Sequence, residues 1–418
     1  MKKLIVLFTL ILLIGITVTS QNISELYNNE TIKLEAINGY GELNNWEDVF
    51  SPPPKEWSFD KSLGEQKQIV VAPDGSVFMS HKTSHEIWKF DAEGNFVNKF
   101  GQKGSRPGQF PMLPKVEGIL DGKYIFTSDV NGRIQFFDFN GKYIKTLLLD
   151  YMPLDVRSLG NSKIAILGHV PWKNRHTKRI IAIKDFNSGD EKIIWSQLKD
   201  NRRGKMLIEL SNGTLMNLSI PGTYPWPRLA SSKSGNLIAA FPDDGHVSIY
   251  SPEGDEIKSF RLNIDPIKIE QEDIDDYYNA GKSNIGRFEE RLKKAGNFSN
   301  EEIEDMVSQY KMQIGKLKYE DIYPDHLPYF ANIMVDSDGN ILVFEYTEKK
   351  NKKSNIFRVY SYDLSGKYLN RSSFVSDEYK LHFSSHSFIF HDNYIINIAK
   401  KKEGSGNLMR LVKFSIVE

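Results

Sequence analysis

The sequence predicts an all-β protein, a six-bladed β-propeller of four-stranded antiparallel blades with a helical insertion between blades four and five. Three observations support this prediction. A hairpin pattern recurs along the chain, a second hairpin precedes each copy, and the strand-favouring residues Phe and Tyr number 25 and 19. With 418 residues, the chain is long enough for one large β domain.

The recurring hairpin is an alternating apolar strand, a turn with Asp or Ser that ends in Gly, and a second alternating strand. IWKFDAEGNFVNKF, residues 87–100, shows it in full, and IQFFDFNGKYIKTL repeats it from Ile134. Alternation with a period of two indicates half-buried strands, and turn residues of this kind join antiparallel neighbours. Further copies stand at residues 180–194, 247–260 and 357–374.

A second hairpin precedes each copy, as in VVAPDGSVFMS, GILDGKYIFTS and IMVDSDGNILVFE. Two hairpins make one four-stranded sheet, and sheets repeated about every 40 to 50 residues close into a propeller. A sixth, less regular copy begins at Phe388 and shows one strand fewer. We therefore expect an N-terminal strand near TIKLEAI or EWSFD to complete it and hide an edge. The hairpin within Lys205–Ile220 is expected to extend blade three or to form the edge of blade four.

The segment from Gly75 to Phe110 resembles the NHL repeat in GSVFMS, EIWKFDAEGNFVNKFG and GSRPGQF, and residues 127–147 share part of the pattern. The resemblance implies that the loop with Gly and Pro carries the chain from the outer strand of one blade to the inner strand of the next. Most of the chain is similar to six-bladed propellers that bacteria secrete. That group includes lyases, lactone hydrolases and many members without a known activity. In the NHL lyases, histidines at channel positions bind a metal.

The N-terminus predicts export. Lys2 and Lys3 precede an apolar run from Leu4 to Val18, which is typical of a secretory signal and short for a membrane span. We expect residues 1–20 to be removed after Ser20, with an uncleaved anchor as the alternative. Residues 21–418 would then form one propeller domain in the periplasm or outside the cell, without a transmembrane span.

Composition excludes several classes of function. Lys and Arg together number 54, and Asp and Glu together also number 54. The chain therefore has no excess of positive charge that would favour binding to nucleic acid. There is no Cys, which excludes disulfides, thiolate metal sites and Cys nucleophiles. The catalytic motifs G-x-S-x-G and H-E-x-x-H and the phosphate-binding loop are absent from the sequence.

Residues of about 265–320 break the strand pattern. Ser299 and Glu302 form a capping box at the start of a predicted helix. Apolar residues at helical spacing follow, namely Ile303, Met306, Val307, Tyr310, Ile314 and Leu317. We expect this stripe to pack on the propeller, with a partner-binding surface or a lid over one face as alternatives.

Candidate site residues come from aligning the strand that precedes each central hairpin. If the alignment holds, polar residues at the ends of these strands surround one mouth of the central channel: His81, Asp129, His169, Asp243, Asp244 and Glu345. Imidazole and carboxylate groups could hold a divalent cation there. The alternative is that a water-filled channel is lined by polar residues anyway, and that Asp129 only accepts hydrogen bonds from its turn and from Arg133. No cofactor is expected otherwise.

Loops rich in Trp and Pro suggest a ligand surface. HVPWKNRH contains Trp172, and TYPWPRL contains Trp226 and Arg228. Exposed Trp beside Arg is suited to sugars or peptides, although both Trp side chains could instead fill gaps between blades. In YPDHLPYF, His326 and Tyr329 could face the channel mouth.

Two functions follow from these residues. The first is an exported binding protein or scaffold that recognises a protein, peptide, glycan or envelope partner on the channel-mouth face. The second is a metal-dependent lyase or hydrolase in the channel. Propellers host both roles, so the fold alone leaves the question of an enzyme open.

Overall fold

The computed structural model describes residues 23–46, 49, 68–81, 85–112, 114–171, 176–200, 205–209, 215–219, 226–272, 275, 285–286, 288–290, 292–294, 296, 298–316, 325–345, 357–382, 386–402 and 409–417. The expected signal sequence and Trp172 lie outside these residues, and so does the side chain of His81. Within the described part of the chain, no helix has both the length and the apolar character needed to cross a membrane.

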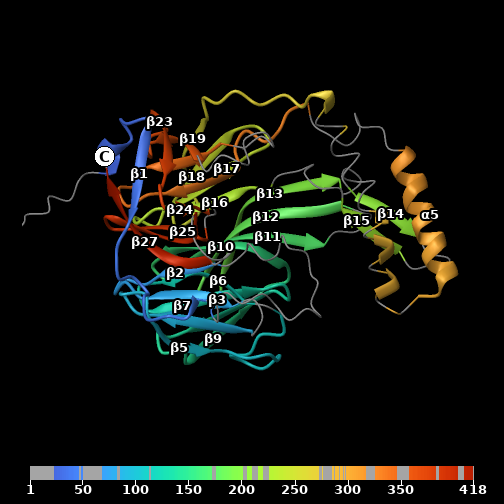
Figure 1. Ribbon diagram of the computed structural model, residues 1–418, viewed down its shortest axis with the longest axis horizontal. Coiled ribbons are helices and arrows are strands. Elements are labelled where there is room, and N and C mark those ends of the chain that lie inside the picture. The colour runs from blue at the N-terminus through green and yellow to red at the C-terminus, as the bar shows by residue number, and fades with distance from the viewer. Residues whose placement is uncertain are drawn as a thin grey trace, which may run out of the picture.

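The chain is all-β in class, as predicted, and four of its sheets are separate four-stranded units (Figure 1). Unit 1 contains β2 (Ile69–Val71), β3 (Val77–His81), β4 (Glu86–Phe90) and β5 (Phe96–Phe100). Unit 2 contains β6 (Lys115–Leu120), β7 (Tyr124–Asp129), β8 (Arg133–Phe137) and β9 (Tyr143–Leu148). Unit 3 contains β10 (Met152–Gly160), β11 (Lys163–Pro171), β12 (His176–Asp185) and β13 (Glu191–Asp200). Unit 4 contains β16 (Arg228–Ser231), β17 (Leu237–Phe241), β18 (His246–Tyr250) and β19 (Glu256–Arg261).

Two further units share one larger sheet. Unit 5 contains β20 (Asn332–Val335), β21 (Ile341–Phe344), β22 (Phe357–Tyr362) and β23 (Tyr368–Val375). Unit 6 contains β25 (Phe388–His391), β26 (Tyr394–Lys401), β27 (Met409–Val417) and the N-terminal β1 (Thr31–Ala36). β1 pairs antiparallel with β27 and parallel with β23, so it joins the units. The short helix α2 (Ile23–Leu26) precedes β1, and β24 (Tyr379–Lys380) pairs with β26.

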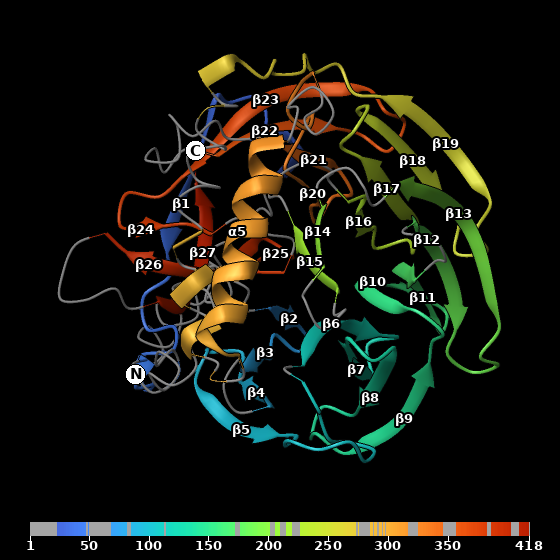
Figure 2. The same cartoon turned by 90° about the vertical axis from the view of Figure 1, so that its right-hand side faces the viewer.

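The units are arranged around a common centre, with the first strand of each nearest to it and the last strand outermost (Figure 2). Apolar clusters lie between neighbouring units. Phe126 and Phe136 of unit 2 pack with Ile166 of unit 3, for example. Corresponding clusters join units 1 and 2, 3 and 4, 4 and 5, 5 and 6, and finally 6 and 1. Each sheet therefore buries its faces only by stacking on its neighbours, as in repeat architectures.

The turns have the predicted chemistry. Oδ1 of Asp91 accepts hydrogen bonds from the backbone N–H groups of Glu93 and Asn95, at 3.1 and 2.7 Å. Gly94 then adopts a φ of 82°, in the left-handed region that favours Gly. Asp138 and Asp363 make the same pair of contacts in units 2 and 5.

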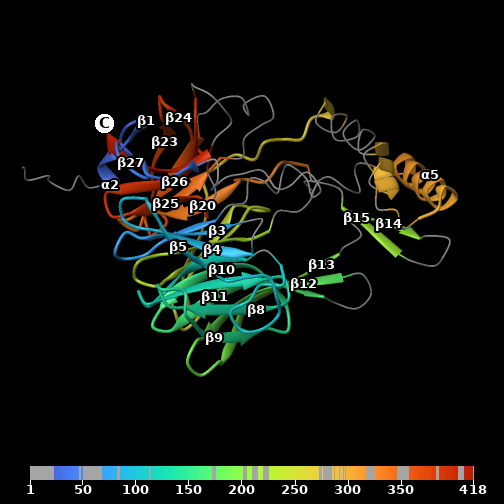
Figure 3. The same ribbon diagram turned by 60° about the horizontal axis from the view of Figure 1, so that its bottom comes forward.

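Two segments stand away from the ring (Figures 1 and 3). Among the described strands, β14 (Lys205–Glu209) and β15 (Leu215–Ser219) pair with each other and with no strand of units 3 or 4, so the expectation that this hairpin would join blade three or four was wrong. The hairpin lies beside α5 (Asn300–Lys316), which contacts β14. The hairpin of β14 and β15 follows β13 in the chain. The strands β12 and β13 are each 10 residues long and reach toward α5 in Figure 1.

The start of α5 has the predicted capping box. The N–H of Ser299 donates to Oε2 of Glu302 at 2.8 Å, and the N–H of Glu302 donates to Oγ of Ser299 at 3.2 Å. The side chain of Ile314 and all of Leu317 lie outside the described residues. The described part of the apolar stripe does not pack on the described residues of units 1 to 6, contrary to expectation. Among the described side chains, it packs within the insertion itself, on neighbours that include Phe288 and Leu292. The insertion has its own small core because its shorter helical segments supply those neighbours.

Candidate functional site

A cluster of ionisable side chains lies where the first strands of units 2, 3 and 6 begin. Glu117 belongs to β6, Asp155 and Arg157 belong to β10, and His386 comes just before β25. A carboxylate oxygen of Glu117, one of Asp155 and a ring nitrogen of His386 all lie within 4.8 Å of one another. We call these four residues the channel cluster, because the first strands are nearest the centre of the ring.

β-Bulges place two of these side chains. Val116 pairs with Thr127 and Gly118 pairs with Phe126, so Glu117 is an extra residue in β6. The register of β10 also shifts, between Pro153 and Asp155. Bulges bend a strand and redirect the side chain at the bulge, which is why they recur next to functional sites.

Arg157 is the centre of the contacts in the cluster. Its Nε lies 3.1 Å from Oδ1 of Asp155, and its Nη2 donates to Oδ2 of Asp155 at 3.3 Å. Nη2 also lies 3.3 Å from Nε2 of His386. A guanidinium can only donate, so Nε2 accepts and the imidazole is neutral with its proton on Nδ1.

Burial determines the charge of His386. Desolvation, followed by the charge of Arg157, lowers its pKa to about 3 although Asp155 opposes this. Lys115 and Arg228 act in the same direction. Burial would raise the pKa of Asp155, but the charge and the hydrogen bond of Arg157, together with the other cationic groups nearby, lower this pKa overall, so the carboxyl stays ionised.

Glu117 differs from Asp155. Its side chain is 3 % exposed, and Oγ of Ser128 donates to its Oε1 at 2.5 Å. Its Oε2 is buried without a hydrogen-bond partner among the described residues. Burial, and the charge of Asp155, raise the pKa of Glu117. When protonated, Glu117 has an O–H that can donate from Oε2.

The donor set of two carboxylates and one imidazole is compatible in type with a divalent cation. Arg157 competes for the same atoms, because its Nη2 lies 3.3 Å from both Oδ2 of Asp155 and Nε2 of His386. As placed, these side chains fit a cation only if the guanidinium moves away.

The aligned residues of the sequence analysis lie one strand further out. His81, Asp129 and His169 end or nearly end the second strands β3, β7 and β11, and each faces a polar residue of the third strand. Oδ2 of Asp129 accepts from Nε of Arg133 at 2.8 Å, and its Oδ1 accepts from the N–H of Asn131. Glu345, after β21, pairs with Arg371 and lies 3.8 Å from Arg358. These residues therefore lie further from the centre of the ring than the first strands do.

The remaining predicted residues lie around units 3 to 5. Trp226 is half-buried, with the Arg179 guanidinium 3.9 Å from its ring centroid and the His169 ring edge-on at 5.7 Å. Arg228 begins β16, and its Nε donates to the carbonyl of Ala331 at 3.0 Å. His326 and Tyr329 pack edge-on at 5.2 Å beside the turn of unit 4, where the N–H of Tyr329 donates to the carbonyl of Pro242.

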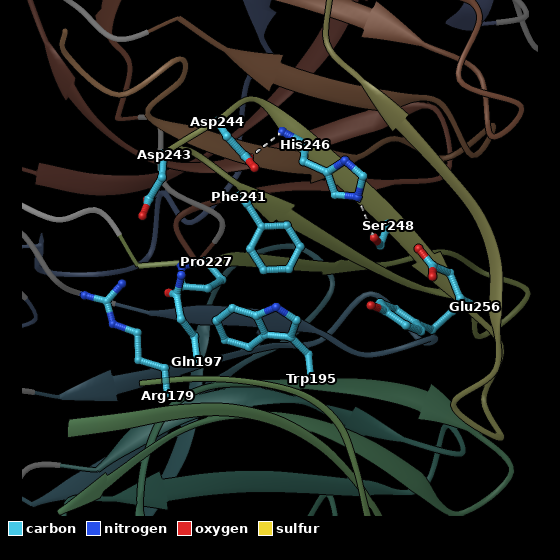
Figure 4. A pocket seen from close by; sticks show the side chains of 11 residues that line it. Arg179, Trp195, Gln197, Pro227, Phe241, Asp243, Asp244, His246, Ser248 and Glu256 are labelled. Carbon is cyan, nitrogen blue, oxygen red and sulfur yellow. Dashed lines mark hydrogen bonds between the residues drawn. The ribbon is translucent and has the colours of Figure 1, made fainter. Parts of the chain in front are cut away.

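A surface pocket of about 300 Å³ lies between units 3 and 4 (Figure 4). Side chains of β12 and β13 form one wall, and side chains of β17, β18 and β19 form the other. The rings of Trp195 and Phe241 meet inside it, with centroids 5.0 Å apart. Asp243 and Asp244, which the sequence analysis assigned to the channel mouth, line this pocket instead. The rest of the pocket and the channel cluster were not predicted from the sequence.

No protein-family profile matches the chain. No curated protein matches it either. Among solved structures, it is similar to a candidate exported protein of Bacteroides fragilis, with 13 % identity, 96 % of this chain and 97 % of that chain covered, and a TM-score of 0.48. A member of the DUF4221 family from Bacteroides vulgatus shares 11 % identity over 93 % of this chain and 98 % of that chain, at a TM-score of 0.45. Virginiamycin B lyase of Staphylococcus aureus shares 9 % identity over 84 % of this chain and 96 % of that chain, at a TM-score of 0.37. These identities and TM-scores are low, so the strand pairing and the arrangement of the units define the fold.

Proposed function

We propose that this chain is an exported six-bladed β-propeller that binds its ligand at the channel mouth, through an acidic group of a peptide, glycan or envelope partner. The six blades are units 1 to 6, and the insertion lies between blades four and five. The observation that carries the proposal is the buried Oε2 of Glu117, which has no hydrogen-bond partner among the described residues and is near the cations Lys115 and Arg157. A buried polar atom without a partner is costly, so a ligand or a water is expected there.

Charge favours an acidic ligand group. Lys115, Arg157 and Arg228 all act electrostatically on His386, whereas Asp155 is the ionised acid of the cluster. When Glu117 carries a proton, it adds a donor instead of a negative charge. A carboxylate or phosphate group could then accept from Glu117 and interact with the nearby cations, in contacts that are stronger than those between neutral groups.

The imidazole of His386 is unsuited to act as a general base, so a catalytic function would have to use Glu117, whose pKa is raised by burial to about 7. The pKa of His386 is lowered to about 3, far below the range where a general base works well near neutral pH. Its Nε2 already accepts from Arg157. The alternative, a metal-dependent lyase or hydrolase, is supported by the close approach of the three potential ligand atoms.

Small ions distinguish the two functions. The mature protein would be titrated with acetate, inorganic phosphate, Ca²⁺ and Zn²⁺, and ligand-induced thermal shifts would be measured at about pH 6 and about pH 8. We expect the anions to stabilise the protein, more strongly at the lower pH, where Glu117 holds its proton.

The variant Glu117→Gln keeps a donor at this position at every pH. It should retain anion binding and lose the pH dependence, whereas Glu86→Gln on β4 should behave as wild type. Stoichiometric binding of Ca²⁺ or Zn²⁺ that disappears in Glu117→Gln would instead support the metal-dependent alternative.

A further inference from the structure

The pocket between units 3 and 4 is built around two aromatic side chains from facing sheets. The first is Trp195 on the fourth strand of unit 3, which pairs with Ile181 directly after a bulge. Counted from the turn, Phe100, Leu147 and Phe260 hold the same place in units 1, 2 and 4, so the fourth strands commonly carry an apolar side chain here.

The opposite wall supplies the second ring. In unit 4, Phe241 ends β17 and pairs with His246 of β18. Trp195 and Phe241 are both only half-buried, so their rings leave surface open to the pocket. The two rings meet at 5.0 Å across one cleft and give the pocket an apolar face for a ligand.

Polar groups surround the two rings on several sides. Figure 4 shows Arg179 and Asp243 toward one end of the pocket, and His246, Ser248 and Glu256 toward the other. Arg179 is 5 % exposed and lies on the ring of Trp226, which holds its guanidinium in place. Nε2 of His246 lies 3.1 Å from Oγ of Ser248, and the N–H of His246 donates to Oδ1 of Asp244 at 3.0 Å.

We propose that this pocket binds a neutral hexopyranose unit, free or as part of a glycan. A hydroxyl both donates and accepts, so a ring of hydroxyls can meet the carboxylates and the guanidinium of the rim at once. A sugar ring also has a C–H face that packs on aromatic rings. A volume of about 300 Å³ is at the lower end for small-molecule sites and suits one sugar ring.

Charged ligands suit the pocket less well. An anion would face the carboxylates of Asp243, Asp244 and Glu256, and a cation would face the buried guanidinium of Arg179. Packing alone would also explain two rings in contact, but it would not require polar groups at both ends of the cleft. The site is separate from the channel cluster, so either proposal can fail without the other.

Saturation-transfer NMR tests the proposal on the mature protein. The probes are the methyl glycosides of glucose, galactose, mannose and N-acetylglucosamine, each titrated to about 100 mM to detect millimolar affinity. 1,5-Diaminopentane and glutarate serve as charged probes. We expect at least one glycoside to bind saturably through its ring protons, and the charged probes to show no saturable binding.

Trp195→Asn removes one of the two aromatic rings of the pocket and leaves a polar side chain in its place. It should weaken glycoside binding at least tenfold, whereas Leu198→Asn, on the same strand but outside the pocket, should leave it unchanged. If Trp195→Asn does not fold, Glu256→Gln at the exposed rim is the test, with weaker binding expected. Absence of glycoside binding to the wild type, binding of the diamine or glutarate alone, or undiminished binding in the folded pocket variants would overturn the proposal.

Discussion

The hydroxyl of Tyr27 donates a 2.8 Å hydrogen bond to Oδ2 of Asp336, which lies 309 positions further along the chain. Tyr27 is 1 % exposed, and Ser372 donates to its carbonyl group at 3.1 Å. The segment before β1 is thus held by unit 5, and β1 itself pairs with β23 of unit 5 and with β27 of unit 6. Together these contacts tie the N-terminal segment to both units.

Tyr27→Phe is expected to lower the free energy of unfolding by about 1–2 kcal/mol, because a hydrogen bond to a buried carboxyl is lost. The loss should be moderate because Nδ2 of Asn340 still donates to the same oxygen at 2.8 Å. Denaturant unfolding measures the difference. Tyr368→Phe, at a side chain that is 41 % exposed, is the matched control and should change stability little. Equal stability of both variants and the wild type would contradict a structural role for Tyr27.

Glu117 should make the protein less stable as the pH rises. Burial raises its folded-state pKa above the ordinary value of 4.5. The folded state therefore holds the proton more tightly, so this contribution is complete below the ordinary pKa and is lost as the pH rises through the raised pKa. Glu117→Gln removes the contribution. Unfolding free energies of the two proteins, compared from about pH 4 to about pH 8, should show the wild type losing stability relative to the variant. A constant difference over that range would contradict the raised pKa.

His386 should make the protein less stable as the pH falls. Its folded-state pKa is lowered from 6.5 to about 3, so the unfolded chain binds a proton that the folded chain does not. Below the ordinary pKa, wild-type stability should fall, by up to a few kcal/mol at about pH 4. His386→Gln should flatten this acid limb of the unfolding curve, and His391→Gln is the control at a less buried imidazole. Between the ordinary pKa values of Glu, 4.5, and His, 6.5, rising pH lowers stability through Glu117 and raises it through His386. The two contributions are therefore separated by measuring each single variant.

The sequence predicted the units well because their signals are local. Asp91 and Gly94 form one turn within a few residues, and alternation shows which strand faces are buried. The packing of α5 was mispredicted because periodicity identifies an apolar face but not its neighbour. Phe288 and Leu292 are in the same insertion and could have suggested that the face packs there.

The channel cluster had no comparable signal. Glu117 is the extra residue of a bulge, Asp155 follows a register shift, and His386 stands outside a strand. A simple alignment of repeats therefore gives them no common position. The alignment instead selected residues such as Asp129, which end the second strands and pair with their own neighbours. Comparison of the starts of the first strands, where KVEG and LDVR carry charge, is the signal that could have found the cluster.

Export should remove residues 1–20. Intact-mass measurement of the protein recovered from the periplasm or the medium should give a chain that begins at Gln21. A mass that includes the apolar run Leu4–Val18 would favour the uncleaved anchor. Lys2→Glu with Lys3→Glu should slow export, because the basic start of a secretory signal would be lost.

Removal of β1 should be far more damaging than any of these substitutions. β1 lies between β23 and β27, with Ile32 opposite Phe374 and Leu34 opposite Ile416. A chain that begins at Gln66 lacks this strand and Tyr27, so it exposes the unpaired edges of both neighbours. It also loses Ile32 and Leu34 from the cluster between units 5 and 6. Burial of each such side chain is worth about 1.5–3 kcal/mol, and the hydrogen bonds of β1 add to this.

We expect a strongly lowered melting temperature or aggregation, relative to a chain that begins at Gln21. Addition of a synthetic peptide covering residues 21–40 should partly restore the melting temperature if the deleted strand can pair again. Equal melting temperatures for the two chains would show that the ring closes without β1.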